Sequence, residues 1–428
     1  MNLLIKSARI IDTNSNYHNK IMDILIQNGE IVKIAKLIRI SKNLVENNQV
    51  LEFTKPNLHV SPGWFDLHVN FSDPGDEQKE TLISGSNAAA KGGFTGVMTM
   101  PNTTPSLDNK SLIKYIINTT KENIVDVLPA GNMTKKQEGN DIVEMQDMSM
   151  AGCLVFTDDK HSISKNEVLK IGMLYAKDCN ALIMNYPNEN SISNNGHMHE
   201  GEVSTKLGIK AIPALAEEMM VDRDINICEY TNSRFHLSYL STKKSTSKLK
   251  KAKNSGLNIT ADVAVHNLFL TDEAINNFDT RYKVMPPLRT SKDSKALIKA
   301  LRNGTIDAIT SDHTPQNEEN KKIDFENSAH GIIGLESAFG LICKYLLPFL
   351  DISQIIEKIA INPRKIIGIS QATIEVGNKA NMTLFNPDLK WKFTKEDIKS
   401  KSINSPFIGK ELKGKALAIY NKGQFKEC

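Results

Sequence analysis

One stretch near residue 60 restricts most strongly what this chain can fold into. Residues 62–75 read PGWFDLHVNFSDPG, an apolar run bracketed at both ends by Pro-Gly pairs. Asp66, His68 and Asn70 stand at alternate positions, so their side chains share one face of a β-strand. Burying three polar side chains in this way is costly unless each finds a partner. Two interpretations remain open: a half-exposed strand with a satisfied histidine, or a buried strand whose polar groups hold a metal or a ligand.

The middle of the chain alternates short apolar runs with amphipathic helical patterns. Helical patterns follow several of these runs, and one of them opens with Ser164 and Glu167 in the spacing of a capping box. Eight such β-α units are typical of a (β/α)8 TIM barrel. The eight predicted strands are residues 64–71, 96–100, 124–130, 152–157, 181–186, 234–240, 258–265 and 306–312.

Both ends of the chain have a different pattern. Residues 1–60 predict short strands with a turn at Asn28-Gly29, and residues 371–428 repeat this β-rich pattern. We therefore expect an α/β protein in which residues 61–370 form the barrel. The two terminal segments are predicted to meet in one small β-sandwich domain.

Bulk composition excludes several classes of partner. The chain has 428 residues, 40% hydrophobic and 24% charged, with a net charge of only +4, which gives no basis for nucleic-acid or membrane binding. One basic run, residues 243–253, has the spacing of a solvated helix face, which we favour over a phosphate-binding role. Five cysteines without a C-x-x-C pair predict reduced thiols, and the first residues lack a signal-peptide pattern, so a cytoplasmic protein is expected.

Polar side chains follow the predicted strands at the points where the strands end. In a (β/α)8 barrel these ends converge at one mouth, where catalytic groups lie. A carboxylate that follows an apolar strand is partly buried and needs a cation or several hydrogen bonds. The sequence therefore predicts a pocket at the mouth, formed by groups that include His68, Asn102, Asp159, His266 and Asp312.

Three long motifs extend this interpretation. They are GGFTGVMTMPNTTP (92–105), HMHEGEVSTKLGI (197–209) and RNGTIDAITSDHTP (302–315). Together with the opening PG-x-x-D-x-H, they resemble dihydroorotases of the long, multifunctional-complex type, within the cyclic amidohydrolase superfamily. The resemblance covers nearly the whole chain. It implies a TIM barrel, cyclic-amide hydrolysis in pyrimidine biosynthesis, and a zinc centre.

The expected metal-ligand positions are only partly retained. The resemblance places the family's six ligands at His68, Asn70, Asp159, Tyr186, Tyr239 and Asp312. A neutral amide and two phenols are poor ligands for zinc. We therefore expect at most one weakly held zinc, on His68, Asp159 and Asp312. The resemblance also makes Asp312 the general base of the reaction.

The substrate positions are eroded as well. Ser72 stands where the resemblance expects an arginine that would bind the substrate carboxylate bidentately. Substrate-binding positions are retained at Asn102, His313 and Gly331. Two other groups have plainer interpretations: His236 is expected to be a satisfied core residue, and the paired Glu217 and Glu218 are expected on the wet face of a helix.

These observations leave competing hypotheses for function. The first is a catalytically impaired or inactive protein that acts as a structural partner of aspartate transcarbamoylase, as degenerate relatives of the resembled family do. The second is an active dihydroorotase with one metal, which interconverts dihydroorotate and N-carbamoyl-aspartate. The third is a sensor that binds a cyclic ureide in the predicted pocket at the barrel mouth. A homo-oligomer is expected in each case.

Overall fold

The computed structural model describes residues 2–40 and 50–428. All eight predicted barrel strands are confirmed within these residues, in two parallel runs, β6–β7–β8 and β9–β10–β13–β14–β15. Single bridges join the runs at Gly131–Phe156 and Val69–His313, which closes a (β/α)8 TIM barrel. The strands are β6 (Trp64–Val69), β7 (Phe94–Thr99), β8 (Asp126–Pro129), β9 (Val155–Phe156), β10 (Leu182–Asn185), β13 (Phe235–Leu237), β14 (Ile259–Ala264) and β15 (Ala308–Thr310).

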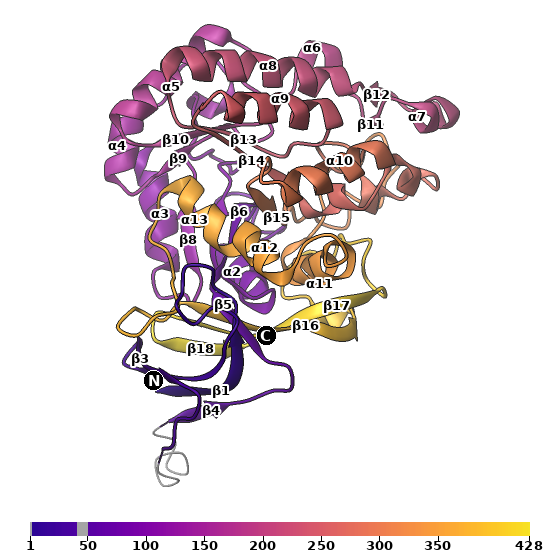
Figure 1. Ribbon diagram of the computed structural model, residues 1–428. Coiled ribbons are helices and arrows are strands. Elements are labelled where there is room, and N and C mark those ends of the chain that lie inside the picture. The colour runs from indigo at the N-terminus through magenta and orange to yellow at the C-terminus, as the bar shows by residue number, and fades with distance from the viewer. Residues whose placement is uncertain (1, 41–49) are drawn as a thin grey trace.

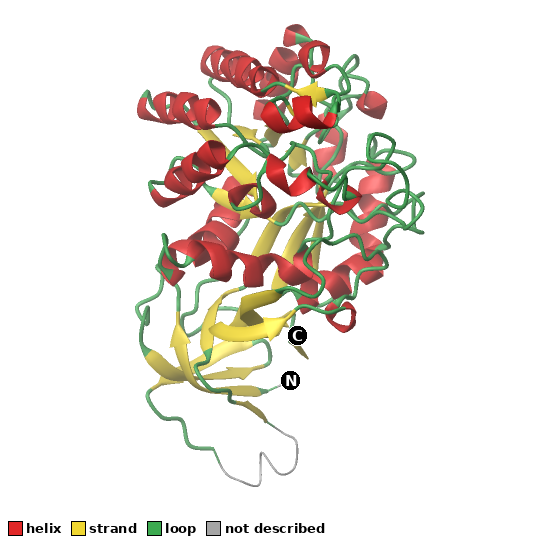
Figure 2. Ribbon diagram, turned by 90° about the vertical axis from the view of Figure 1, so that its right-hand side faces the viewer, coloured by secondary structure: helices red, strands yellow, loops and turns green. Residues whose placement is uncertain are grey.

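Helices surround the barrel and cover the outer faces of its strands (Figures 1 and 2). Their apolar sides join the strands in the main hydrophobic core. The principal helices are α2 (Leu82–Lys91), α3 (Lys110–Thr120), α4 (Met145–Met150), α5 (Asn166–Asp178), α8 (Ala214–Thr231), α9 (Lys243–Asn254), α10 (Ser291–Arg302), α11 (Leu335–Leu346), α12 (Ile352–Ile356) and α13 (Asn362–Ile367). A small excursion beyond β10 contains α6 (Asn190–Ser193), β11 (Met198–His199), α7 (Glu202–Leu207) and β12 (Ala211–Ile212).

Side-chain caps begin several of the helices, but α5 has none. Thr81 caps α2 and Thr290 caps α10, each in a reciprocal capping box. The capping box predicted from Ser164 and Glu167 is wrong: α5 begins one residue later, with Lys165 at the cap position and no side-chain cap. Ser164 therefore lies one residue too early to reach the free N–H groups of the first turn.

The terminal segments form one eight-stranded sheet below the barrel (Figure 1). Antiparallel pairing of β5 with β16 joins the N-terminal strands to the C-terminal ones, and the turn at Asn28-Gly29 connects β2 to β3. A separate apolar core holds the sheet together. Its strands are β1 (Leu3–Ile10), β2 (Ile21–Gln27), β3 (Glu30–Ala35), β4 (Leu51–Phe53), β5 (His59–Pro62), β16 (Met382–Lys392), β17 (Glu411–Asn421) and β18 (Gln424–Glu427).

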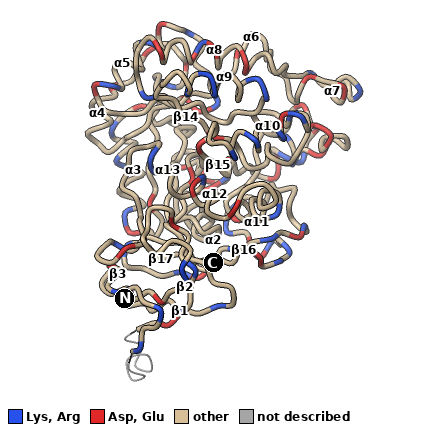
Figure 3. Tube along the Cα trace, viewed as in Figure 1, with Lys and Arg blue, Asp and Glu red and all other residues tan. Residues whose placement is uncertain are grey.

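Charges of both signs are interspersed along the chain (Figure 3). The basic run of residues 243–253 forms α9, which buries Leu249 and Ala252 and directs most of its lysines outward, as predicted. Within the described residues, no helix combines the length and the apolar character that crossing a membrane requires.

Candidate active site

The two polar residues of β6, Asp66 and His68, and Asn70 directly after it each find a partner inside the barrel. Asp66 accepts hydrogen bonds from a hydroxyl and a backbone N–H at the end of β15. His68 Nε2 contacts the carboxylate of Asp262 on β14, and the Asn70 amide donates to Thr314 Oγ1 at 3.3 Å. All three side chains are buried. The strand is therefore buried, as the second interpretation expected, but its polar groups bond other side chains and backbone of the barrel, so each has a partner without a metal or a ligand.

One side of the mouth is built around Asp262. This carboxylate accepts hydrogen bonds from His68 and, at 2.8 Å, from His236 Nε2. Burial raises the pKa of Asp262, but the two imidazoles outweigh it and hold this pKa below the usual value. Burial likewise lowers the pKa of His68, but Asp262 outweighs it, so that this pKa is raised. His236 also bonds Thr260 at 2.8 Å, which confirms it as a satisfied core residue.

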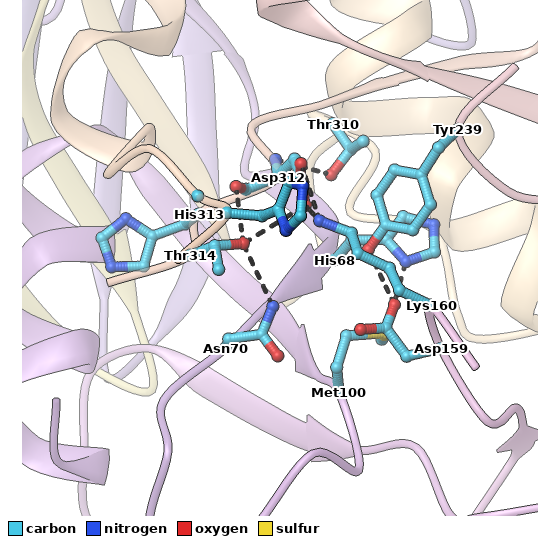
Figure 4. Close-up of polar contacts among 12 residues, drawn as sticks. His68, Asn70, Met100, Asp159, Lys160, Tyr239, Thr310, Asp312, His313 and Thr314 are labelled. Carbon is cyan, nitrogen blue, oxygen red and sulfur yellow. Dashed lines mark hydrogen bonds and ion pairs between the residues drawn. The ribbon is translucent and has the colours of Figure 1, made fainter. Parts of the chain in front are cut away.

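The other side of the mouth is built around a lysine ammonium. Lys160 Nζ lies 2.7 and 3.0 Å from the two carboxylate oxygens of Asp312, and 4.9 Å from the centre of the Tyr239 ring (Figure 4). Asp312 is 1% exposed and the Lys160 side chain 16%. Burial raises the pKa of Asp312 to about 6 even though the ammonium counteracts it.

Hydrogen bonds hold the carboxylate of Asp159 beside this ion pair. Tyr239 OH donates to Asp159 Oδ1 at 3.0 Å, and Asn102 Nδ2 donates to the other oxygen of Asp159. Asn102 also donates to Asn70 Oδ1 at 3.2 Å and accepts from Gln137 at 2.7 Å. Both oxygens of Asp159 therefore already have donors.

The six expected ligand positions converge at this mouth. The Tyr239 ring lies 4.2 Å from the ring of His68 and 6.3 Å from that of Tyr186, centre to centre. Asp159 accepts a hydrogen bond from Tyr239. Thr314 connects the remaining two positions, because its hydroxyl lies 3.3 Å from Asn70 Nδ2 and 3.4 Å from Asp312 Oδ1. The six positions that the resemblance assigns to metal ligands therefore lie close together in the structure.

Two of the expected substrate positions lie beside the cluster. His313 is fully buried, and its Nδ1 accepts from the backbone N–H of Gly334 at 3.1 Å, so that its ring faces the start of α11. Gly331 has a φ of +133°, and a Cβ at this position would lie 2.6 Å from Thr314. Only glycine fits this close approach without strain.

His266 is a further group close to Asp312. Its Nε2 lies 3.9 Å from Asp312 Oδ2 and makes no hydrogen bond to a described residue. Burial lowers the pKa of His266 to about 3, so the ring is neutral at physiological pH. It is therefore a weak partner for the carboxylate, and Lys160 supplies the positive charge.

Sequence reasoning missed Lys160 and Asp262, and it misplaced a glutamate pair. A charged residue inside the apolar run of residues 258–265 was the available signal for Asp262.

The expectation of a wet face for Glu217 and Glu218 is wrong, since both are buried. Glu217 accepts hydrogen bonds from the backbone N–H groups of residues 241 and 242, at 3.0–3.2 Å.

The donor set does not fit the zinc centre that the resemblance implies. Lys160 places a positive charge within 3.0 Å of both oxygens of Asp312, and a metal cation there would be repelled. Burial raises the pKa of Tyr186 and of Tyr239 above the usual range, so both stay neutral phenols. Within the described residues, one group has the spacing of a cation site: His68, His236 and Asp262, whose ligand atoms lie within 4.8 Å of one another. Both imidazoles already bond the Asp262 carboxylate.

Solved structures with a similar fold identify the architecture of this chain. A similar structure is the L-hydantoinase (dihydropyrimidinase) from Arthrobacter aurescens, with a TM-score of 0.83 and 19% identity over 99% of this chain and 95% of that one. Another is the D-hydantoinase (dihydropyrimidinase) from a Thermus species, with a TM-score of 0.78 and 21% identity over 100% and 97% of the two chains. At this identity the two likenesses show the fold, a TIM barrel with a separate sheet domain.

Sequence relatives narrow this class to one family. Residues 58–245 match the family described as dihydro-orotase-like. The chain is 38% identical over 418 residues to a dihydroorotase from Geobacter metallireducens, with 97% of each chain covered. It is 39% identical over 429 residues to one from a Thermoanaerobacter species, covering 100% of this chain and 97% of the relative. The chain belongs to the dihydroorotase family.

Proposed function

We propose that this dihydroorotase-family protein has little or no metal-dependent hydrolase activity of its own. The ion pair between Lys160 and Asp312 carries the proposal. Hydrolysis of a cyclic amide in this family needs an activated water and a carboxylate that can take its proton. An ammonium can neutralise Asp312, but it has no open coordination position that would bind a water and lower its pKa.

The proposal assigns the barrel a structural role in pyrimidine biosynthesis, as a cytoplasmic partner of aspartate transcarbamoylase. Two features support it. The eight strands of the barrel are in place, while the mouth carries an internal cation, and the carboxylate oxygens of Asp159 and Asp312 already have donors. The resemblance described above also includes degenerate relatives that scaffold this enzyme.

A second candidate is an active dihydroorotase with a single metal ion, acting on dihydroorotate. The relatives that share 38% and 39% identity are named dihydroorotases, which favours it. The His68, His236 and Asp262 group is where the described residues offer donors for one ion. Binding there would require the ion to replace two buried hydrogen bonds to Asp262.

Metal content and turnover of the purified full chain separate the two candidates. We expect well under one zinc per chain, and no interconversion of dihydroorotate and N-carbamoyl-aspartate above that of an Asp312→Asn variant. Stoichiometric zinc together with turnover that disappears in Asp312→Asn would establish the enzyme instead. Growth and purification with added zinc ensure that a low metal content does not reflect supply.

The partnership has its own test. The chain is co-expressed with the aspartate transcarbamoylase of the same cell, and the complex is sought by size-exclusion chromatography at micromolar concentrations. A stable complex with defined stoichiometry is expected. Separate elution of the two proteins would contradict the structural role, whatever the turnover measurement gives.

A further inference from the structure

The base of the barrel, at the opposite end from the mouth, holds a buried arginine without an acidic partner. Arg364 on α13 is 5% exposed and belongs to no ion pair with a described residue. Its guanidinium donates only through Nη2, to Gly63 O and Thr95 Oγ1 at 3.3 Å each and to Asn381 Oδ1 at 3.5 Å. Nε has no hydrogen-bond partner among the described residues.

A guanidinium in this position is poorly compensated. It carries five N–H donors and stays charged near neutral pH, although burial lowers the pKa of Arg364 to about 10. Its Cζ lies 5.6 Å from the centre of the Phe65 ring. Neutral acceptors, one ring and the charge of Asp126, which is itself paired with Lys422, offset only part of the cost of removing a full charge from water.

Arg364 borders a cavity of about 440 Å³ between the small sheet and the base of the barrel. Two hairpin turns form one wall, residues 28–30 and 421–423, and they approach so closely that a Cβ on Gly29 would lie 4.0 Å from Gly423 Cα. Residues 370–372, which follow α13, and residues 379–381 complete the lining. The volume lies within the range of sites for small metabolites.

The lining offers unused donors and a positive charge. Four side chains on it make no hydrogen bond to a described residue, namely Asn28, Ser370, Gln371 and Lys379. Lys422 also borders the cavity, but it pairs with Asp126 at 3.0 Å. Glu30 is the one acidic residue among the lining residues. Two cations on the lining, Arg364 and Lys379, form no ion pair within the described chain, so positive charge is in excess.

We infer that this cavity binds a small metabolite through a phosphate or carboxylate group, with Arg364 as the deep anchor and Lys379 at the rim. An oxyanion suits this lining because guanidinium groups bind such anions with charge-assisted hydrogen bonds. The site is separate from the mouth and does not depend on the function proposed for it.

Calorimetric titration of the purified chain with inorganic phosphate tests the inference, with malonate as the carboxylate probe and sodium chloride at matched ionic strength as the reference. Saturable binding of at least one probe is expected, and the stronger probe identifies the anionic group. Arg364→Met should raise its Kd about tenfold or more, since it removes a charged hydrogen-bond donor. Lys379→Met should raise it only a few-fold, because this lysine is exposed.

Lys365→Met is the matched control. Lys365 follows Arg364 on the same helix, is exposed and does not border the cavity, so its removal should leave Kd unchanged. Heat no greater than that of sodium chloride with both probes would overturn the inference, and so would an unchanged Kd in Arg364→Met. Circular dichroism checks that this variant folds. If Arg364→Met does not fold, Arg364→Lys is measured in its place. An unchanged Kd in both Arg364→Lys and Lys379→Met would likewise overturn the inference.

Discussion

The two ends of the barrel differ in how a buried charge is compensated. At the mouth, the carboxylate of Asp312 has an internal counter-ion, since Lys160 contacts both of its oxygens. At the base, the guanidinium of Arg364 contacts neutral acceptors and has no acidic partner in the described chain. The mouth is therefore electrostatically self-contained, whereas the base still requires an ion from solution. A charged residue type alone does not reveal which end binds a ligand.

The largest expected effect is the loss of the internal counter-ion at the mouth. Lys160→Met leaves the Asp312 carboxylate buried without a partner, and breaking one side of a buried pair costs about 3–5 kcal/mol. We expect a fall of at least about 3 kcal/mol in the free energy of unfolding at pH 8, measured with urea. Lys165→Met, which removes an exposed lysine from the same loop, should change it by less than about 0.5 kcal/mol.

The pH dependence of this loss has a definite sign. The pKa of Asp312 is raised to about 6 from 3.8, so the folded chain binds its proton more tightly than the unfolded chain does. Asp312 therefore lowers the stability as pH rises from about 4 to about 6. Without Lys160 this pKa rises further, so Lys160→Met should be less destabilising at pH 5 than at pH 8. An equal loss at both pH values would contradict the ion pair.

The barrel could be predicted from the sequence because each strand is a short apolar run between helical patterns. Its eight positions follow from periodicity alone, and so does the convergence of polar groups at the mouth. The alternation of Asp66, His68 and Asn70 in one apolar run was sufficient to single out β6. Local rules such as these act over a few residues, which a single sequence displays directly.

The partners of those groups could not be predicted in the same way. Lys160 and Asp312 are 152 residues apart, and only the closure of the barrel brings them together. A lysine after two aspartates resembles an ordinary solvated turn. Arg364 was missed for a similar reason: its burial depends on how the small sheet covers the base of the barrel, and no local pattern encodes that contact.

A smaller effect compares the two tyrosines of the mouth. Tyr239 OH donates to Asp159 at 3.0 Å, whereas Tyr186 makes no hydrogen bond to a described residue through its hydroxyl. Tyr239→Phe should cost about 1–2 kcal/mol, because it removes a donor from a buried carboxylate. Tyr186→Phe should cost less than about 0.5 kcal/mol. Urea unfolding of both variants checks the difference, and equal losses would show that Asp159 does not depend on this donor.

The smallest effect is expected at the base, although the residue involved is also buried and charged. Arg364→Met removes a guanidinium with no acidic partner. The protein then no longer has to bury a charge, and this gain offsets the lost hydrogen bonds. The free energy of unfolding should therefore change by less than about 1 kcal/mol without added anions. Arg289→Met is the matched comparison. Arg289 is 3% exposed, bonds Ser241 and lies 3.9 Å from Glu217, so its loss should cost several times more. A loss at Arg364 as large as that at Arg289 would mean that the protein itself already compensates this charge, and the contrast between the two ends of the barrel would not hold.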